Sequence, residues 1–387
     1  MKIQDVTNEL TYRAHPTKCN VRFNPSIVHH KKNIFYMVYR LFVPKGNPRN
    51  NGIPIPWKTK WKSETQHTVF TVLKLINGKF KVISETPVVS PDDYQIEDAR
   101  IFKRTGRCYL SFNTWSWNMK GWTRKTANSN TFNRCNSSYS CTYMAKSLLS
   151  IKANEVRLKN ITFPCLNSSR MLPALKRCYD DQCEEKNWLW FHNKDNDRLM
   201  VYWFEPHTIF KENKNKCYIH SETHPKNSTY GEKALKKVWP TLAFRLSAAP
   251  ISYNKTEYLA MGHIKYQYLK DTIIPKHILK KKILHFDISC PHKRATKLVY
   301  MMFFYTFSKS KPHRVKRVSH AFVPEDNKYL LPFPMSIANN TCNSFIISYG
   351  EGDKLCKMLT MSRSEIESLL IKYEDVNPQN YKFIVGL

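Results

Sequence analysis

The sequence has few glycines, few acidic residues and no long hydrophobic run. Only 10 of its 387 residues are glycine, whereas tyrosine and phenylalanine number 21 each, a balance that favours strands with aromatic side chains over helices. Its apolar runs stay far short of the ~18 consecutive residues that a membrane-spanning helix needs. Residues 1–6 have no apolar core behind Lys2 and do not resemble a secretory signal. These absences predict an all-β protein with no membrane span and a cytoplasmic location.

Basic residues greatly outnumber acidic ones. Lysine and arginine total 62 against 30 acidic residues, which gives a net charge of +32 and predicts attraction to polyanions or acidic substrates. The positive charges are spread along the chain and are dense only at residues 280–282 and 311–317, and no nucleic-acid-binding signature accompanies them. We therefore expect phosphates or acidic substrates as partners rather than nucleic acid.

The cysteines do not predict a metal site. There are 11, an odd number with irregular spacing, so we expect mostly reduced thiols. The pairs Cys135/Cys141 and Cys178/Cys183 lack both a C-x-x-C spacing and a histidine partner. The Asp-Asn-Asp sequence at residues 195–197 imitates a metal motif of sugar-nucleotide transferases, but these residue types are also common in hairpin turns. We predict no metal and no cofactor.

Short aromatic or β-branched segments alternate with polar turns along most of the chain, as in antiparallel strands. Strands are expected at residues 34–41, 68–75, 79–83, 141–149, 156–163, 187–192, 198–205, 243–249, 257–263, 297–307, 329–337 and 344–349. Asn77-Gly78 is a strong two-residue hairpin turn. The pattern recurs roughly every 60–80 residues in about five units, which is typical of a propeller or a sandwich.

These units predict a single five-bladed β-propeller domain covering residues 1–387, with blades at about 20–361. Residues 44–65 and 116–140 would form long loops over the axial funnel, where the inner strands of all blades converge. A short C-terminal helix is expected at about 362–373, capped by Ser362 with Glu365 and with Ile366, Leu369, Leu370 and Tyr373 on its apolar face.

Two adjacent carboxylates, Glu97 and Asp98, precede Arg100 where a predicted hairpin begins. Residues 101–102 and 109–112 are its strands, and residues 104–107 its turn. Rigid elements of this kind often carry catalytic groups, although an ordinary solvated turn with an ion pair would have the same sequence.

Five separate stretches resemble, in order, the motifs of one family. They are Asn24-Pro25-Ser26 with Tyr39-Arg40, Glu97-Asp98-Ala99-Arg100-Ile101, Glu185-Lys186-Asn187-Trp188 with Glu205-Pro206-His207, Arg245 with Gly262-His263, and Ser348-Tyr349-Gly350 with Asp353. They are similar to the five-bladed family-130 glycoside phosphorylases and hydrolases and the related β-mannosyltransferases, over most of residues 20–361. Ala99 stands where this family usually has proline, and the two long loops would reshape the acceptor side.

The resemblance implies an enzyme that makes or breaks a β-mannoside-type bond with inversion at the anomeric carbon. It implies that Asp98 is the proton donor. The substrate-binding groups it implies are Asn24, Arg40, Glu97, Arg100, Glu205 and Asp353, the last as an acceptor of a sugar hydroxyl. The phosphate-binding groups it implies are Lys186, His207, Arg245 and His263.

The residue types of the candidate site also favour a glycosyl-transferring enzyme with a phosphate-bearing co-substrate. An inverting hydrolase needs a second carboxylate ~6.5–9.5 Å from the acid to activate water, whereas a phosphorylase needs cations that hold an attacking phosphate. The candidates include more cations than spare carboxylates. We therefore favour phosphate, a sugar 1-phosphate or a sugar nucleotide as co-substrate, with an oligosaccharide or glycan as acceptor. Repulsion from Glu97 would keep Asp98 protonated, and Arg100 would oppose that effect, so the direction stays open.

Other interpretations remain open. The protein could be an inverting glycoside hydrolase, or a non-catalytic basic propeller that binds glycans or nucleic acid, whose affinity for a polyanion would fall steeply with salt. His207 and His263 could be core histidines, Arg40 a strand-end ion pair, and Glu205 a brace for the Pro206 turn. Four tryptophans would either stack on sugar rings or fill the core: Trp115, Trp117, Trp122 and Trp203.

Overall fold

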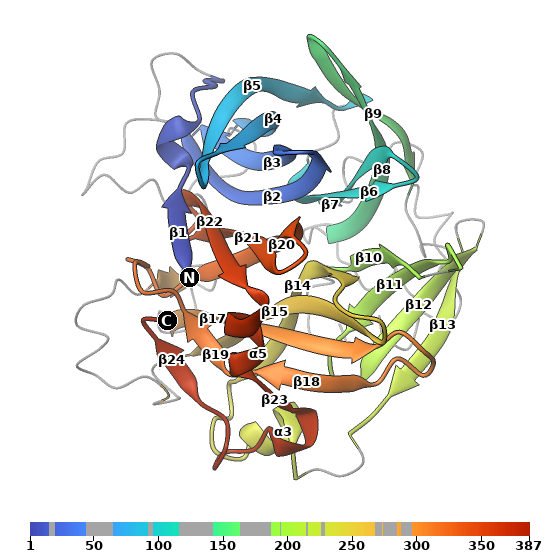
Figure 1. The fold of residues 1–387 in the computed structure, drawn as a ribbon, viewed down its shortest axis with the longest axis vertical. Coiled ribbons are helices and arrows are strands. Elements are labelled where there is room, and N and C mark those ends of the chain that lie inside the picture. The colour runs from blue at the N-terminus through green and yellow to red at the C-terminus, as the bar shows by residue number, and fades with distance from the viewer. Residues whose placement is uncertain are drawn as a thin grey trace, which may run out of the picture.

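The computed structural model describes residues 1–14, 20–43, 65–91, 96–115, 142–162, 187–193, 195–213, 216–225, 229–267, 273, 285–287 and 296–387. Nearly every element in this part of the chain is a β-strand, as the composition predicts. Twenty of the described strands fall into five antiparallel groups of four, called groups 1 to 5 below. Figure 1 shows group 1 at the top, groups 2 and 3 following on the right, group 4 below, and group 5 back beside group 1.

Groups 1 and 2 share one eight-stranded sheet. Group 1 contains β2 (Val21–Lys31), β3 (Ile34–Val43), β4 (Thr65–Ile76) and β5 (Lys79–Val89). Group 2 contains β6 (Glu97–Arg104), β7 (Arg107–Trp115), β8 (Thr142–Lys152) and β9 (Glu155–Thr162). A short parallel pairing of β5 with β9 joins the two groups. The predicted turn between β4 and β5 is confirmed, since Asn77 and Gly78 have φ values of 50° and 76°, as a type I′ hairpin requires.

Groups 3 and 4 contain strands that the sequence did not reveal. Group 3 consists of β10 (Leu189–His192), β11 (Arg198–Trp203), β12 (His207–Asn213) and β13 (Lys216–Thr223). Group 4 consists of β14 (Ala243–Ser252), β15 (Glu257–Gln267), β17 (Thr296–Ser308) and β18 (Val315–Ser319). The short strands β16 (His285–Asp287), β19 (Ala321–Val323), β23 (Leu370–Lys372) and β24 (Phe383–Val385) extend the sheet of group 4. The polar strands β12, β13 and β18 were not predicted, because only tertiary pairing stabilises such sequences as strands.

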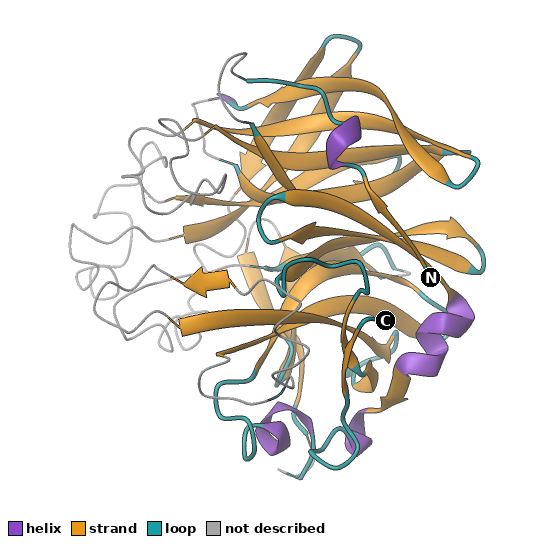
Figure 2. Ribbon diagram, turned by 90° about the vertical axis from the view of Figure 1, so that its left-hand side faces the viewer, coloured by secondary structure: helices purple, strands orange, loops and turns teal. Residues whose placement is uncertain are grey.

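Group 5 brings the two ends of the sequence into one sheet. It contains β20 (Pro332–Thr341), β21 (Ser344–Glu351) and β22 (Leu355–Ser362), and β1 (Lys2–Asp5) pairs with β22 as the fourth strand. The sheet therefore includes residues before position 20, where the predicted blades begin. The two termini lie side by side in Figures 1 and 2.

The described helices are short and lie outside the strand array (Figure 2). Helix α5 (Arg363–Leu369) begins at Ser362 with the predicted capping box. The expected extension to about residue 373 is wrong, because residues 370–372 form β23, which pairs with β18. The helix α3 (Gly231–Leu235) and the 3-10 helices η1 (Thr7–Glu9) and η6 (Tyr373–Asp375) were not predicted. No helix among the described residues is long and apolar enough to span a membrane.

Hydrophobic clusters join each group to the next. Group 1 packs on group 2 through Val38, Phe70 and Phe112, and group 2 on group 3 through Met144 and Trp190. Representative residues of the remaining clusters are Phe191 and Phe303 between groups 3 and 4, Met261 and Ile347 between groups 4 and 5, and Met37, Ile346 and Met358 between groups 5 and 1. The series of packed interfaces therefore returns to its starting point.

Candidate functional site

The first strands of the five groups, β2, β6, β10, β14 and β20, contact one another in a series. Strand β2 contacts β6 and β20, and β14 contacts β10 and β20. Hydrogen bonds cross between these strands: the Ile101 amide donates to Ser26 Oγ at 3.0 Å and the Ile27 amide to Ser336 Oγ at 2.6 Å. Residues from distant parts of the chain therefore meet here. We call this place the central site and build it around Asn24, Arg40, Glu97, Asp98, Arg100 and Asp353.

The backbone of the central site is held in an uncommon conformation. Asn24, Asp98, Asn187 and Asp353 have φ values of 52°, 48°, 65° and 52°, and Asn and Asp are the non-glycine residues that tolerate this region best. Register shifts in β2 and β6 occur at Asn24 and Asp98. Bulges of this kind re-aim side chains. Such strain persists where the surrounding structure enforces it, and it concentrates at functional sites.

The Asp98 carboxylate is fixed by two donors from group 1. Asn24 Nδ2 lies 2.8 Å from Asp98 Oδ1, and Arg40 Nη1 lies 3.3 Å from the same oxygen. Arg40 Nη1 is also 3.0 Å from Glu97 Oε1, and these three charged side chains are only 10–16% exposed. Arg40 is in turn held by Gln66, whose Oε1 accepts from Nη2 at 2.5 Å. The site thus contains one guanidinium between two adjacent carboxylates.

A third carboxylate, Asp353, belongs to the same electrostatic cluster. Burial and the nearby Asp98 carboxylate raise the pKa of Asp353 to about 6, against the opposing effect of Arg40. Burial disfavours the charge of Arg40, but Glu97, Asp98 and Asp353 outweigh that effect and raise its pKa. We therefore expect Asp353 to change protonation close to neutral pH.

Gly350 lets group 5 approach Asn24. A Cβ atom on Gly350 would lie 2.1 Å from Asn24 Oδ1, a distance that real Cβ atoms do not reach, and 3.0 Å from the Asn24 amide nitrogen, which is tighter than most real contacts. The glycine of the Ser348-Tyr349-Gly350 motif is thus explained by close approach of two backbones, which places Asp353 near Asp98.

Arg100 makes hydrogen bonds to three separate residues of the chain. Its side chain is buried, with Nε donating to the Ser247 carbonyl at 2.6 Å, Nη1 to the Asp98 carbonyl at 3.1 Å and Nη2 to Asn187 Oδ1 at 2.8 Å. Its guanidinium also lies 5.8 Å from the Phe333 ring. Burial lowers the pKa of Arg100 to about 10. Because these donors face protein acceptors, the structure gives Arg100 a positioning role around Asp98.

His263 and Arg245 lie side by side on β15 and β14 but differ in environment. His263 is buried, with Nδ1 2.6 Å from Ser247 Oγ and its ring 4.6 Å from that of Tyr300. Burial, together with the nearby Arg245, Lys265 and Arg100, lowers the pKa of His263 well below its usual value. Arg245 lies 5.0 Å over the Trp203 ring and forms no ion pair within the described ranges. Arg245 is therefore a cation beside His263 without a described carboxylate partner.

Glu205 and His207 are engaged with other parts of the protein. Glu205 Oε2 accepts from the Glu232 amide at 2.7 Å and from the Tyr373 hydroxyl at 2.5 Å, which anchors the start of α3. His207 is buried with Nδ1 2.9 Å from the His313 carbonyl oxygen, and burial lowers the pKa of His207 to about 3. These contacts fit the interpretation of His207 as a core histidine and of Glu205 as a residue that supports the structure. Lys186, Trp117 and Trp122 lie outside the described residues, as does the Trp115 side chain.

Three residues of the site were missed from the sequence. Gln66, Asn187 and Ser247 bind Arg40 or Arg100 through side chain or backbone. Asn187 lies within a motif that resembles the family and could have been included. Gln66 and Ser247 carry no local signal, since only the fold brings them to their arginines.

The cysteines and the candidate metal ligands differ in their surroundings. Among the described residues there is no group of three or more His, Cys, Asp or Glu that could hold a metal ion, and Asp197 of the Asp-x-Asp sequence pairs with Lys211 at 2.5 Å. Both cysteine pairs considered for zinc lie outside the described residues. Cys108, Cys342 and Cys356 are free, whereas Cys217 is disulfide-bonded. Disulfides are uncommon in the cytosol, so the cytoplasmic location stays a prediction.

No protein-family model and no curated protein matches this sequence. Among solved structures, a β-1,2-mannobiose phosphorylase from Listeria innocua is 11% identical with a TM-score of 0.49, over 95% of this chain and 99% of that one. A mannose phosphorylase from Leishmania mexicana, solved with a phosphate ion, is 10% identical with a TM-score of 0.44, over 91% and 87%. A GDP-mannose-dependent mannosyltransferase from the same organism is 9% identical with a TM-score of 0.44, over 89% and 86%. These proteins are of the classes that the motifs resemble, but at this level of likeness the chemistry of this chain has to be inferred from its own residues.

Proposed function

We propose that the five strand groups are the blades of a five-bladed β-propeller and that the central site transfers a β-mannoside-type glycosyl group with inversion. The closed series of hydrophobic interfaces supports the propeller, since five blades packed in a ring require five such interfaces. The meeting of β2, β6, β14 and β20 supports an axial site, because inner strands converge at the axis of a propeller.

The observation that carries the proposal is the placement of Asp98. A strained backbone at φ 48° presents its carboxylate, and Asn24 and Arg40 both bind Oδ1. In the proposed reaction Asp98 gives its proton to the glycosidic oxygen, directly or through a sugar hydroxyl, while a nucleophile attacks the opposite face of the sugar. The bonds from Asn24 and Arg40 stabilise the anion that remains after the proton leaves.

Arg245 supports a phosphate-bearing co-substrate. It is a cation next to the site, packed against Trp203 and without a described carboxylate partner, so an incoming phosphate would not have to displace an internal ion pair. Phosphate would serve a phosphorylase, and a sugar 1-phosphate or sugar nucleotide would serve a transferase acting on an oligosaccharide or glycan.

An inverting hydrolase is the second candidate, because the central site holds two carboxylates besides Asp98. Glu97 and Asp353 both interact with Arg40 beside Asp98, and either could activate water. A hydrolase would release mannose without phosphate, and this separates the two candidates.

A donor screen by mass spectrometry tests the proposal. The protein is incubated with a β-mannose oligomer with and without phosphate, with mannose 1-phosphate and with GDP-mannose. Asp98→Asn keeps the shape of the residue and its tolerance of positive φ, and should abolish product. Asp195→Asn, an exposed aspartate in a hairpin turn, is the matched control and should retain turnover.

The outcomes are distinct. Phosphate-dependent product identifies a phosphorylase, donor-dependent elongation a transferase, and phosphate-independent mannose a hydrolase. Full turnover by Asp98→Asn would refute the assignment of the acid. No product from any donor, with a folded protein that binds a glycan array, would indicate a non-catalytic sugar-binding propeller.

A further inference from the structure

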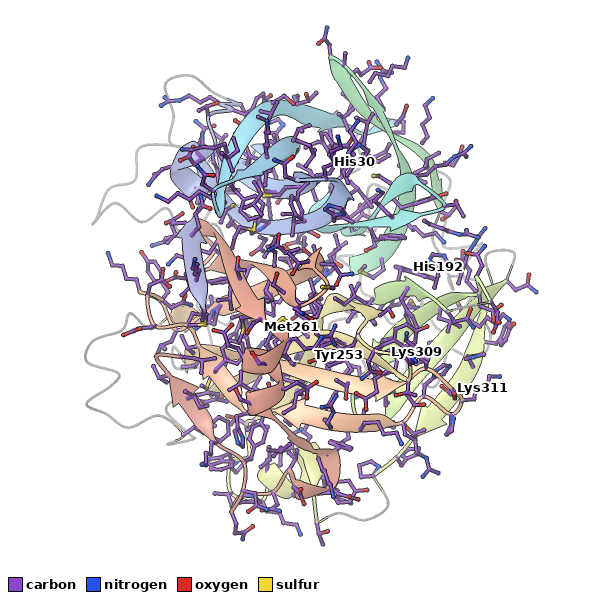
Figure 3. The ribbon with its side chains drawn as sticks, in the orientation of Figure 1. His30, His192, Tyr253, Met261, Lys309 and Lys311 are labelled. Atoms are coloured by element: carbon purple, nitrogen blue, oxygen red, sulfur yellow. The ribbon has the colours of Figure 1, made fainter. Side chains whose placement is uncertain are left out.

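A cavity lies between groups 2 and 3, away from the central site. It has a volume of about 210 Å³ and is lined by strands β6 to β9 on one side and β10 to β12 on the other. Arg104 lines it from the far end of β6, six positions after Asp98, which corresponds to roughly 20 Å at the usual rise of a strand. His192, another lining residue, is labelled between these groups in Figure 3. We call this the cationic cavity.

The lining of the cationic cavity is strongly positive. Arg104, Arg107, Lys146 and Arg198 line it together with a single carboxylate, Glu212. Glu212 is fully buried, and its oxygens lie 2.5 Å from Lys146 Nζ and 3.8 Å from Arg198 Nη1. One carboxylate cannot neutralise four cations, so the lining keeps an excess of about three positive charges.

Buried polar atoms in the same lining have no partner among the described residues. Trp190 is only 4% exposed and its Nε1 donor is unpaired, as is the buried donor Arg104 Nε. The buried atoms His192 Nε2, which donates or accepts according to the tautomer, and Glu212 Oε1, an acceptor, are unpaired as well. Burial, followed by repulsion from Arg104, Lys146 and Arg198, lowers the pKa of His192 to about 4, so this ring adds no charge at neutral pH. Unpaired buried donors are costly and rare. An acceptor-rich ligand would satisfy them.

The size of the cavity limits the ligand. Pockets that enclose a whole small molecule usually measure ~300–1,000 Å³, so this smaller cavity suits a head group. Arginine forks and a lysine match the oxygens of a tetrahedral oxyanion, and the hydroxyl-bearing Tyr109, Ser147 and Thr162 also line the cavity.

We propose that the cationic cavity is a second binding site, which takes the phosphate or sulfate group of a monoester. The cations neutralise the dianion, and the unpaired Trp190 Nε1 donates to one of its oxygens. Phosphate and sulfate esters share this chemistry, and binding measurements distinguish them. The site is separate from the proposed catalytic centre, so it stands whether or not that centre transfers mannose.

Titration calorimetry with glucose 6-phosphate, glucose 6-sulfate and neutral glucose tests the proposal. The Arg245→Gln background is used so that phosphate binding at the central site does not contribute. We expect binding of at least one ester and none of glucose. Arg198→Gln and Arg107→Gln, both at partly exposed or exposed positions, should each weaken ester binding about tenfold. Arg157→Gln changes an exposed arginine of β9 that pairs with Glu155 and does not line the cavity, and it should leave ester binding unchanged.

Several results would overturn the proposal. These are absence of binding by both esters, equal weakening by Arg157→Gln, or binding only of a long polyanion such as heparin with a steep salt dependence. Thermal melting of each variant shows whether it is folded. Trp190→Phe provides a second test, because it removes the unpaired donor, keeps an aromatic ring and should also weaken binding.

Discussion

Single residues of the central site owe their properties to burial as much as to their chemical type. Asp353 is an aspartate near Arg40, yet burial and the neighbouring Asp98 carboxylate raise the pKa of Asp353 to about 6. Arg100 is a cation whose donors are occupied by a carbonyl of its own strand, a second carbonyl and an asparagine. Position in the fold therefore sets the pKa of Asp353 and the internal partners of Arg100.

The raised pKa of Asp353 predicts a dependence of stability on pH. Between about pH 4 and pH 6 the folded protein keeps a proton that the unfolded chain has lost, so the contribution of Asp353 to stability falls as pH rises. Asp353→Asn should therefore be more stable than the wild type above pH 6, by on the order of 1–2 kcal/mol after allowing for partial exposure, and equally stable below pH 4. Urea unfolding from pH 4 to pH 8 measures this. A difference that does not vary with pH would contradict the assignment, and exposed Asp195→Asn is the control.

The three hydrogen bonds of Arg100 predict that the forked shape of its guanidinium matters for stability as well as its charge. Arg100→Lys keeps the charge but cannot reach three separate acceptors, and it leaves buried oxygens without donors. We expect a loss of about 2–4 kcal/mol in the free energy of unfolding, with reduced turnover because the Asp98 backbone loses its support. Arg157→Lys on the surface should cost less than about 1 kcal/mol. If both variants unfold at the same urea concentration, the hydrogen bonds of Arg100 do not stabilise the fold as proposed.

At the level of elements, local signals and tertiary pairing compete for the same residues. The apolar pattern after Ser362 predicts a helix to about residue 373, but α5 ends at Leu369 because residues 370–372 gain strand pairing with β18. The N-terminal end of α5 follows its local sequence. There the Glu365 amide donates to Ser362 Oγ at 3.2 Å, and the Ser362 amide donates to Glu365 Oε2 at 2.6 Å.

The capping box of α5 predicts a measurable loss on substitution. Ser362→Ala removes the acceptor for the Glu365 amide and should lower the free energy of unfolding by about 1 kcal/mol. Ser368→Ala changes an exposed serine of the same helix that does not cap it, and it should be nearly neutral. Chemical denaturation of both variants compares them, and equal losses would show that the cap contributes nothing specific.

At the scale of the whole molecule, the N-terminal segment completes the packing of group 5 against group 1. Strand β1 pairs with β22, the Val6 amide donates to the Cys356 carbonyl at 3.0 Å, and Met1 pairs with Glu365 of α5. Val6 is fully buried in the cluster that links group 5 to group 1. The first residues of the chain are thus part of the interface that completes the series of groups.

This closure predicts a long-range effect of the N-terminal segment. Val6→Ala removes two buried methyl groups and should cost about 2 kcal/mol, including the cavity that remains. Lys2→Ala, at an exposed position of β1, should change little. Thermal melting distinguishes them, and an unchanged melting temperature for Val6→Ala would mean that this interface does not limit stability.

Local signals alone predicted the β-class, the Asn77-Gly78 turn, the cap at Ser362 and the clustering of Glu97, Asp98 and Arg100, because alternation, turn chemistry and capping act over a few residues. The family resemblance assigned Asn24, Asp98 and Asp353 to one site, and the tertiary structure brings them together. Only the tertiary structure occupied Arg100 with internal acceptors and engaged Glu205 and His207 elsewhere. It also decided the pairing of β1 with β22 and the cationic cavity between groups 2 and 3. Burial, positive φ and contacts across hundreds of residues depend on how whole sheets pack, and no short stretch of sequence carries that information.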